Sequence, residues 1–127
     1  PYTPKGDPYG TGDNGHGHGL MQIDDRTWGD WIRRNDWGDP LTNIRKGCAI
    51  LRDDVGYFRA LASMPGIEGG DFLRLALAAY NCGPHSAYVG FREGDSDKYT
   101  TGKNYGRDIL RRAALLRSTV PDLMVSV

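Results

Sequence analysis

Three aspartates in the first quarter of the chain could take part in acid–base chemistry. Asp13 lies in a glycine-rich stretch, and Asp24 and Asp25 follow it after a short apolar run. Glycine lets the backbone approach a ligand closely. Paired carboxylates are what hydrolysis of a glycosidic bond needs, since one group protonates the leaving oxygen and another activates water. Aspartates in such a loop are also common turn formers, so this stretch alone leaves both interpretations open.

Two histidines alternate with glycine between Asp13 and the pair Asp24-Asp25. His16 and His18 have a spacing that could suit zinc, but no third ligand is evident nearby. We therefore predict surface or packing histidines, with neither a metal nor another cofactor.

A second polar group follows a long apolar segment, in Tyr80-Asn81-Cys82-Gly83. A tyrosine hydroxyl and an asparagine amide at a helix end can serve only as local hydrogen-bonding groups. They can also point into a cleft that holds a sugar. The sequence favours the structural interpretation and leaves the second one open.

Helices are expected to make up most of the rest of the chain. Asp39-Pro40 is a typical helix start, and the helix is expected to run to about Leu61. Residues that recur at steps of three and four predict one apolar stripe on it. These residues are Leu41, Ile44, Cys48, Leu51, Val55 and Phe58.

The second half of the chain predicts three further helices. A helix that begins at Asp71 is apolar almost all round, which indicates a central buried helix, and Gly83-Pro84 ends it. A short helix over 85–89 and a last one over about 103–118 follow. The last helix is expected to bury Tyr105, Ile109, Leu110, Ala113 and Leu116.

The start of the chain predicts little regular structure. Residues 1–19 read as a loop or a short irregular hairpin, and 27–32 as a helical turn with Trp28 and Trp31 packed inward. No long strand is expected. The predicted class is therefore mainly helical, with a glycine-rich loop or small hairpin near the start of the chain.

Composition limits the classes of function. With 127 residues, the chain is expected to form a single domain, 1–127. Sixteen basic and sixteen acidic residues cancel, which argues against a nucleic-acid partner. No apolar run is long enough to span a membrane. Cys48 and Cys82 could be two buried thiols or one disulfide bridge, and the sequence leaves both open.

Two motifs taken together resemble the goose-type lysozyme family, within the wider clan of lysozyme-like lytic transglycosylases. Gly19-Leu20-Met21-Gln22-Ile23-Asp24 precedes Ala78-Ala79-Tyr80-Asn81-Cys82-Gly83, and Gly12-Asp13-Asn14-Gly15 resembles the turn ahead of the first motif. Tyr105, in Asn104-Tyr105-Gly106-Arg107-Asp108, resembles a late tyrosine of that family. The resemblance extends from about residue 11 to 117.

The resemblance implies a peptidoglycan hydrolase, a muramidase that cuts the β-1,4 bond between N-acetylmuramic acid and N-acetylglucosamine with inversion. Asp24 would activate the water, and Asp13 would assist it. Gln22 and Asn81 would bind acetamido groups, and Tyr80 would brace the sugar at the cleavage point. Tyr105 and His18 are further candidates for substrate binding, although His18 stands where an aromatic residue is common.

The resemblance also implies a general-acid glutamate on a helix before the glycine-rich loop. Glu68 and Glu93 are the only glutamates, and neither has the expected position. We therefore expect this acid upstream of Pro1, in a domain that is incomplete at its N-terminus. A lytic transglycosylase and a non-catalytic module that binds peptidoglycan or chitooligosaccharides are the alternatives. The expected protein is a monomer that is secreted or delivered to the cell wall, and its partner is the peptidoglycan glycan strand.

Overall fold

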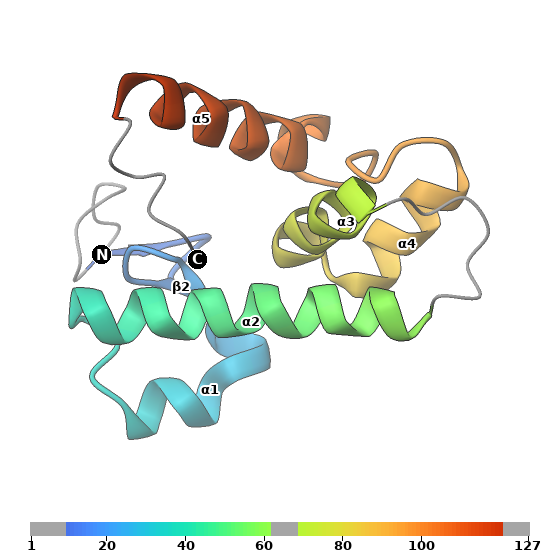
Figure 1. The fold of residues 1–127 in the computed structure, drawn as a ribbon. Coiled ribbons are helices and arrows are strands. Elements are labelled where there is room, and N and C mark those ends of the chain that lie inside the picture. Colours follow the sequence, from blue (N-terminus) through green and yellow to red (C-terminus); the bar gives the residue numbers. More distant parts are fainter. Residues whose placement is uncertain (1–9, 62–68, 121–127) are drawn as a thin grey trace. The chain divides into compact units, whose positions relative to one another are not determined.

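The computed structural model describes residues 10–61 and 69–120, and within them the chain is mainly helical, as predicted (Figure 1). The expectations for residues 1–9 and 62–68, which include the loop at the start of the chain and the position of Glu68, lie outside the described residues, as do residues 121–127. The chain divides into two compact units, Pro1–Ile50 and Leu51–Val127, with the boundary inside helix α2. The prediction of a single domain stays a prediction.

A small antiparallel sheet forms the start of the first unit. The order is β1-β2-β3, with β1 at Thr11–Gly12, β2 at Gly17–His18 and β3 at Ile23–Asp24. The turn between β1 and β2 places Asp13 and Asn14 at positive φ, 51° and 56°. These residue types tolerate the left-handed conformation better than most. The hairpin expected from the glycine-rich sequence is therefore present, with a third strand that the sequence did not predict.

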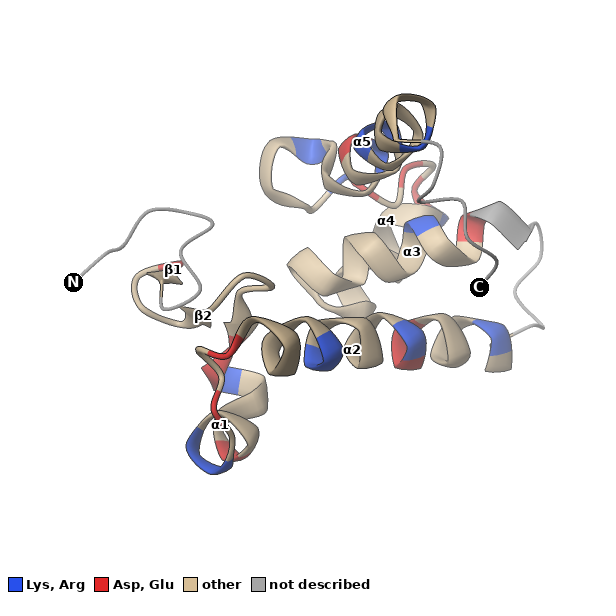
Figure 2. Cartoon of the chain, turned by 60° about the vertical axis from the view of Figure 1, so that its left-hand side comes forward, with Lys and Arg blue, Asp and Glu red and all other residues tan. Residues whose placement is uncertain are grey.

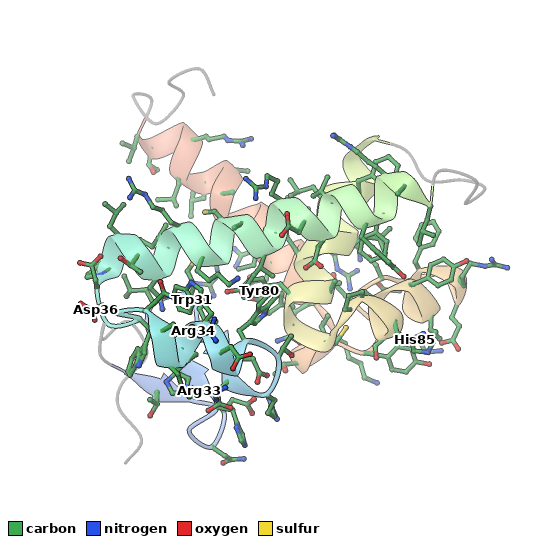
Figure 3. The ribbon with its side chains drawn as sticks, turned by 90° about the horizontal axis from the view of Figure 1, so that it is seen from below. Trp31, Arg33, Arg34, Asp36, Tyr80 and His85 are labelled. Carbon is green, nitrogen blue, oxygen red and sulfur yellow. The ribbon has the colours of Figure 1, made fainter. Side chains whose placement is uncertain are left out.

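Helix α1, at Asp25–Arg34, begins directly after β3. It is longer than the predicted helical turn, and Asp24 is its N-cap residue. Trp28 and Trp31 are half-buried, and the Lys46 ammonium lies 3.8 Å from the centroid of the Trp28 ring. Trp31 is labelled in Figure 3. The inward packing expected of the two tryptophans is therefore only partial.

Helix α2, at Pro40–Ala60, starts where the sequence predicts it. The Asp39 carboxylate accepts a hydrogen bond from the Thr42 backbone N–H at 2.9 Å, which is how an N-cap side chain acts. The predicted apolar stripe is wrong in the first half of the helix. Leu41 and Ile44 are exposed, by 55% and 40%, and Cys48 is exposed as well.

A polar residue and a glycine take the buried face of α2 instead. Asn43 is fully buried, and its amide accepts from the Met21 N–H and donates to the carbonyls of His18 and Trp37 at 2.7–3.0 Å. One turn later, Gly47 has no side chain where the Met21 side chain lies, and a Cβ there would collide with it. The loop before β3 is therefore held against α2 by hydrogen bonds and close backbone packing.

The second unit is built around α3, at Gly69–Cys82, with α4 at Pro84–Arg92 beside it (Figure 1). The predicted central helix is confirmed, since Leu75 to Ala79 are all buried, but it begins at Gly69 and not at Asp71. Helix α4 is longer than predicted. Phe58, from the last turns of α2, lies in the same core. The buried residues of this cluster are Phe58, Leu75, Ala78, Ala79 and Ala87.

A short 3-10 turn, η1 at Thr101–Lys103, leads into α5 at Tyr105–Thr119. The burial predicted for α5 is wrong for Leu116, which is 54% exposed, and Gly106 is the only fully buried residue of the helix. The sequence pattern has the helical period, but in the described residues the last turns of α5 are exposed on all sides.

Both cysteines are free thiols. Cys48 is exposed and Cys82 is half-buried, and burial raises the pKa of the Cys82 thiol. The sequence left open whether these residues form a disulfide bridge or two buried thiols. The structure contains neither arrangement.

Candidate active site

Asp13 and Asp24 meet at one guanidinium group in the first unit. The Arg26 side chain donates from Nη2 to Asp13 Oδ2, and from Nη2 and Nε to Asp24 at 2.6 and 2.9 Å. Asp13 comes from the β1–β2 turn, and Asp24 ends β3. Figure 2 shows acidic and basic segments side by side where the sheet passes into α1. The structure thus brings together two of the residues that the sequence singled out.

The environment keeps Asp24 ionised. The hydrogen bonds from the Arg26 side chain hold the pKa of the Asp24 carboxyl below its usual value, and the Arg26 backbone N–H adds to this effect from 2.8 Å. Partial burial acts in the opposite direction and is outweighed. The same contacts raise the pKa of Arg26. An ionised carboxylate can accept hydrogen bonds from a water molecule.

The neighbouring Asp25 binds both histidines of the glycine-rich stretch. His16 Nδ1 lies 2.8 Å from one carboxylate oxygen, and His18 Nε2 lies 3.0 Å from the other. These bonds lower the pKa of Asp25. His18 Nδ1 is buried without a hydrogen-bond partner among the described residues, and the ring packs edge-on against Trp37. Because a carboxylate only accepts hydrogen bonds, the proton in the contact with Asp25 belongs to His18 Nε2.

Gln22 is a structural residue as well as a candidate ligand for an acetamido group. Its backbone has a positive φ of 50°, and its Nε2 donates to the Gly19 carbonyl at 2.8 Å. The side-chain amide lies against Gly12 and Gly17, where a Cβ on either residue would collide with it. The absence of a side chain at Gly12 and Gly17 therefore leaves room for the Gln22 side chain.

The other predicted substrate-binding residues belong to the second unit. Tyr80, labelled in Figure 3, is half-buried near the end of α3. Asn81 accepts a hydrogen bond from the Thr101 N–H at 2.8 Å, so its Oδ1 fixes the start of η1. Tyr105 begins α5, and burial raises the pKa of its phenol. The structural role that the sequence favoured for Asn81 is thus present.

Glu93 is the only glutamate among the described residues, and its surroundings do not suit a general acid. Its carboxylate accepts hydrogen bonds from Lys98 Nζ and the Tyr99 hydroxyl, both at 2.6 Å. The bond from Lys98 is the main reason that the pKa of Glu93 is lowered. Glu93 is therefore ionised near neutral pH and has no proton to donate.

Sequence reasoning missed several residues that organise this site. Arg26 carries no motif signal, although its position two residues after an N-cap aspartate could have pointed to it. Asn43 was missed because only apolar residues were expected on the buried face of this helix. In the described parts of the chain, no group of three or more metal-ligating side chains could hold a metal ion. None of the helices described there has the length and apolar character that crossing a membrane requires.

Comparison with known families identifies the chain. A model described as the transglycosylase SLT domain matches residues 5–100. The chain belongs to this family. The match includes Asp13, Gln22, Asp24, Tyr80 and Asn81 and ends before Tyr105. Neither curated proteins nor solved structures gave a match.

Membership of the SLT family places the protein in the lysozyme-like clan and indicates that it acts on peptidoglycan. This agrees with the mainly helical fold. The match supports the clan expected from the sequence, and it does not distinguish the goose-type branch within that clan.

Proposed function

We propose that this SLT-family protein hydrolyses the β-1,4 bond between N-acetylmuramic acid and N-acetylglucosamine, in the manner of a goose-type lysozyme. The observation that carries the proposal is the meeting of Asp13 and Asp24 at Arg26. Inverting hydrolysis needs a water molecule held by carboxylate on the face of the sugar opposite the leaving group. Two ionised carboxylates from separate elements supply such a holder.

The two carboxylates differ in how open they are to water. Both oxygens of Asp24 accept hydrogen bonds from Arg26, whereas only Oδ2 of Asp13 does so. Asp13 is also the more exposed of the two, at 60% against 37%. In the proposed reaction, Asp13 orients the water through Oδ1, and Asp24 takes the proton as the water attacks the anomeric carbon.

The leaving oxygen must receive a proton as the bond breaks. Since Glu93 is paired with Lys98, it does not supply this proton. We retain the glutamate on a helix before Pro1 as the proposed donor. Tyr80 and Asn81 are proposed to contact the sugar, and Asn81 keeps its Nδ2 group for an acetamido oxygen.

A lytic transglycosylase is the second candidate, and one observation favours it. Asp24 caps α1 and pairs with Arg26, so it already has a structural role. A transglycosylase needs no water-activating carboxylate, because the sugar's own hydroxyl attacks and an anhydro end forms. The description of the matched family agrees with this reaction.

Product analysis separates the candidates. Intact protein is incubated with purified peptidoglycan, and the fragments are identified by mass spectrometry. Reducing ends support hydrolysis, anhydro ends support the transglycosylase, and binding without cleavage supports a non-catalytic module. Asp24→Asn should lower hydrolysis at least tenfold, because an amide cannot accept the proton. Asp30→Asn, which alters an exposed aspartate of α1 paired with Arg33, is the control and should behave as wild type.

The substrate also determines where the protein must act. Peptidoglycan lies outside the cytoplasmic membrane, so we propose that the protein is secreted or delivered to the wall and works there as a monomer. Fractionation of producing cells, together with the mass of the native protein in solution, tests both statements.

A further inference from the structure

We propose that Arg26 is a positioning residue that joins Asp13 and Asp24 into one water-holding pair. This inference rests on the proposed hydrolysis and adds to it a residue outside the motifs that carried the family resemblance. Among the described residues, Arg26 is the only cation that bonds to either carboxylate. Without it, two like charges would face each other and repel.

The direction of the Arg26 side chain is fixed by Asp24, the N-cap residue of its helix. Its backbone N–H donates to Asp24 Oδ1 at 2.8 Å, and its Nε donates to the same oxygen at 2.9 Å. Nη2 then binds Asp24 Oδ2 and reaches Asp13. A planar guanidinium can make these bonds together, whereas a lysine ammonium is a single point charge.

The hairpin is fixed from its other side as well. The turn that carries Asp13 is closed by a hydrogen bond from the Gly15 N–H to the Gly12 carbonyl at 3.0 Å. Beyond the turn, His16 bonds to Asp25 through its ring and, at 2.9 Å, accepts the Asp25 N–H on its backbone carbonyl. Because Asp25, at the start of α1, holds the turn at His16, the next residue, Arg26, meets Asp13 in a defined place.

Loss of Arg26 therefore has two consequences. The distance between the carboxylates is no longer set by a shared partner, and Asp24 loses the main cause of its lowered pKa. Asp24 should then become protonated at higher pH, so the acid limb of the activity profile should move upward. A loss of folding stability alone would not move that limb.

The test compares Arg26→Gln and Arg26→Lys with wild type. Arg33→Gln is the matched control, because Arg33 makes an exposed ion pair with Asp30 on the same helix. Carboxyl titration is followed by NMR, and kcat/KM on peptidoglycan is measured against pH. Arg26→Gln should raise the titration midpoint of Asp24, shift the acid limb upward and lower kcat/KM about tenfold. Arg26→Lys should recover part of both effects, and Arg33→Gln should change neither.

The outcomes separate this inference from the function on which it rests. An Asp24 titration that is the same in wild type, Arg26→Gln and Arg26→Lys would overturn the role of Arg26, whichever product forms. Anhydro ends from the wild type, or full turnover by Asp24→Asn, would overturn the hydrolysis itself. Should Arg26→Gln fail to fold, the Arg26→Lys variant still decides, since it keeps the charge and removes only the planar geometry.

Discussion

Two of the arginine–aspartate clusters in the described residues make similar bonds and differ in burial. In the first unit, Asp13 and Asp24 share Arg26, and all three side chains are more than a third exposed. In the second unit, Asp97 is fully buried and bonds to Arg74. A buried carboxylate with all its bonds made is a structural group, whereas an exposed pair can still bind water or substrate.

The partners of Asp97 explain why it is buried. Its two oxygens accept from the backbone N–H groups of Gly106 and Arg107 at 2.7 and 3.1 Å. These are unpaired donors of the first turn of α5, and Asn104, the N-cap residue, offers them no side-chain bond. Asp97 thus does for α5, from nine residues away, what Asp24 does locally for α1. Both aspartates accept hydrogen bonds from backbone N–H groups at the start of a helix, and only Asp24 remains accessible to solvent.

The largest expected effect comes from the buried cluster. Asp97→Ala removes a buried carboxylate, leaves the backbone N–H groups at the start of α5 without their acceptor and leaves Arg74 with Asp95 alone. It should therefore lower the free energy of unfolding by about 3–5 kcal/mol. Asp95→Ala is the control, since Asp95 also bonds to Arg74 but is 37% exposed. That variant should lose about 1 kcal/mol. Urea denaturation measures both, and equal losses would contradict the distinction drawn from burial.

In the exposed cluster, a substitution should change activity strongly and the free energy of unfolding only slightly. Asn caps a helix about as well as Asp, so Asp24→Asn should change the free energy of unfolding by less than about 1 kcal/mol while it reduces turnover. Asp24→Ala should cost about 1 kcal/mol, because the cap is lost. Denaturation beside the peptidoglycan assay checks this. A stability loss in Asp24→Asn as large as that of Asp97→Ala would make Asp24 a structural residue.

The sequence predicted where the helices begin and end better than it predicted which of their faces are buried. The start of α2 at Asp39-Pro40 and the end of α3 at Gly83-Pro84 follow from local rules for caps and proline, and both were found. Periodicity failed in the first half of α2, because the buried position went to Asn43. An asparagine becomes a core residue only when distant backbone groups meet its amide, and no local pattern contains that information.

The same reason separates the predicted and missed parts of the candidate site. Asp13 and Asp24 could be named from motif and residue type, yet their meeting depends on Arg26 and on the path of the hairpin. The bonds of Asp97 likewise join residues from three segments, at Arg74, Asp95 and Gly106. Such clusters are set by tertiary structure, so sequence reasoning found their members only where a family motif marked them.

The smallest expected effect concerns a carboxylate that lies between the two extremes. Asp54, on α2 within the second unit, is half-buried, and among the described residues it has no hydrogen bond or ion pair. Burial, with a smaller contribution from the charge of Asp53, raises the pKa of Asp54 to about 6. A raised folded-state pKa means that ionisation favours the unfolded chain. The side chain therefore costs no stability below about pH 4, an increasing amount up to about pH 6, and a constant amount above that.

Asp54→Asn should remove this cost. Since water still reaches the side chain, the gain in the free energy of unfolding is expected to be no more than about 1 kcal/mol at pH 7.5. The gain should shrink as the pH falls through 6 and vanish near pH 4. Urea denaturation of both proteins at a series of pH values measures the difference, and Asp30→Asn, which alters an exposed aspartate of α1, is the control. A gain that is independent of pH would mean that charge burial is not its cause, and that partial burial without a partner does not distinguish Asp54 from the exposed carboxylates.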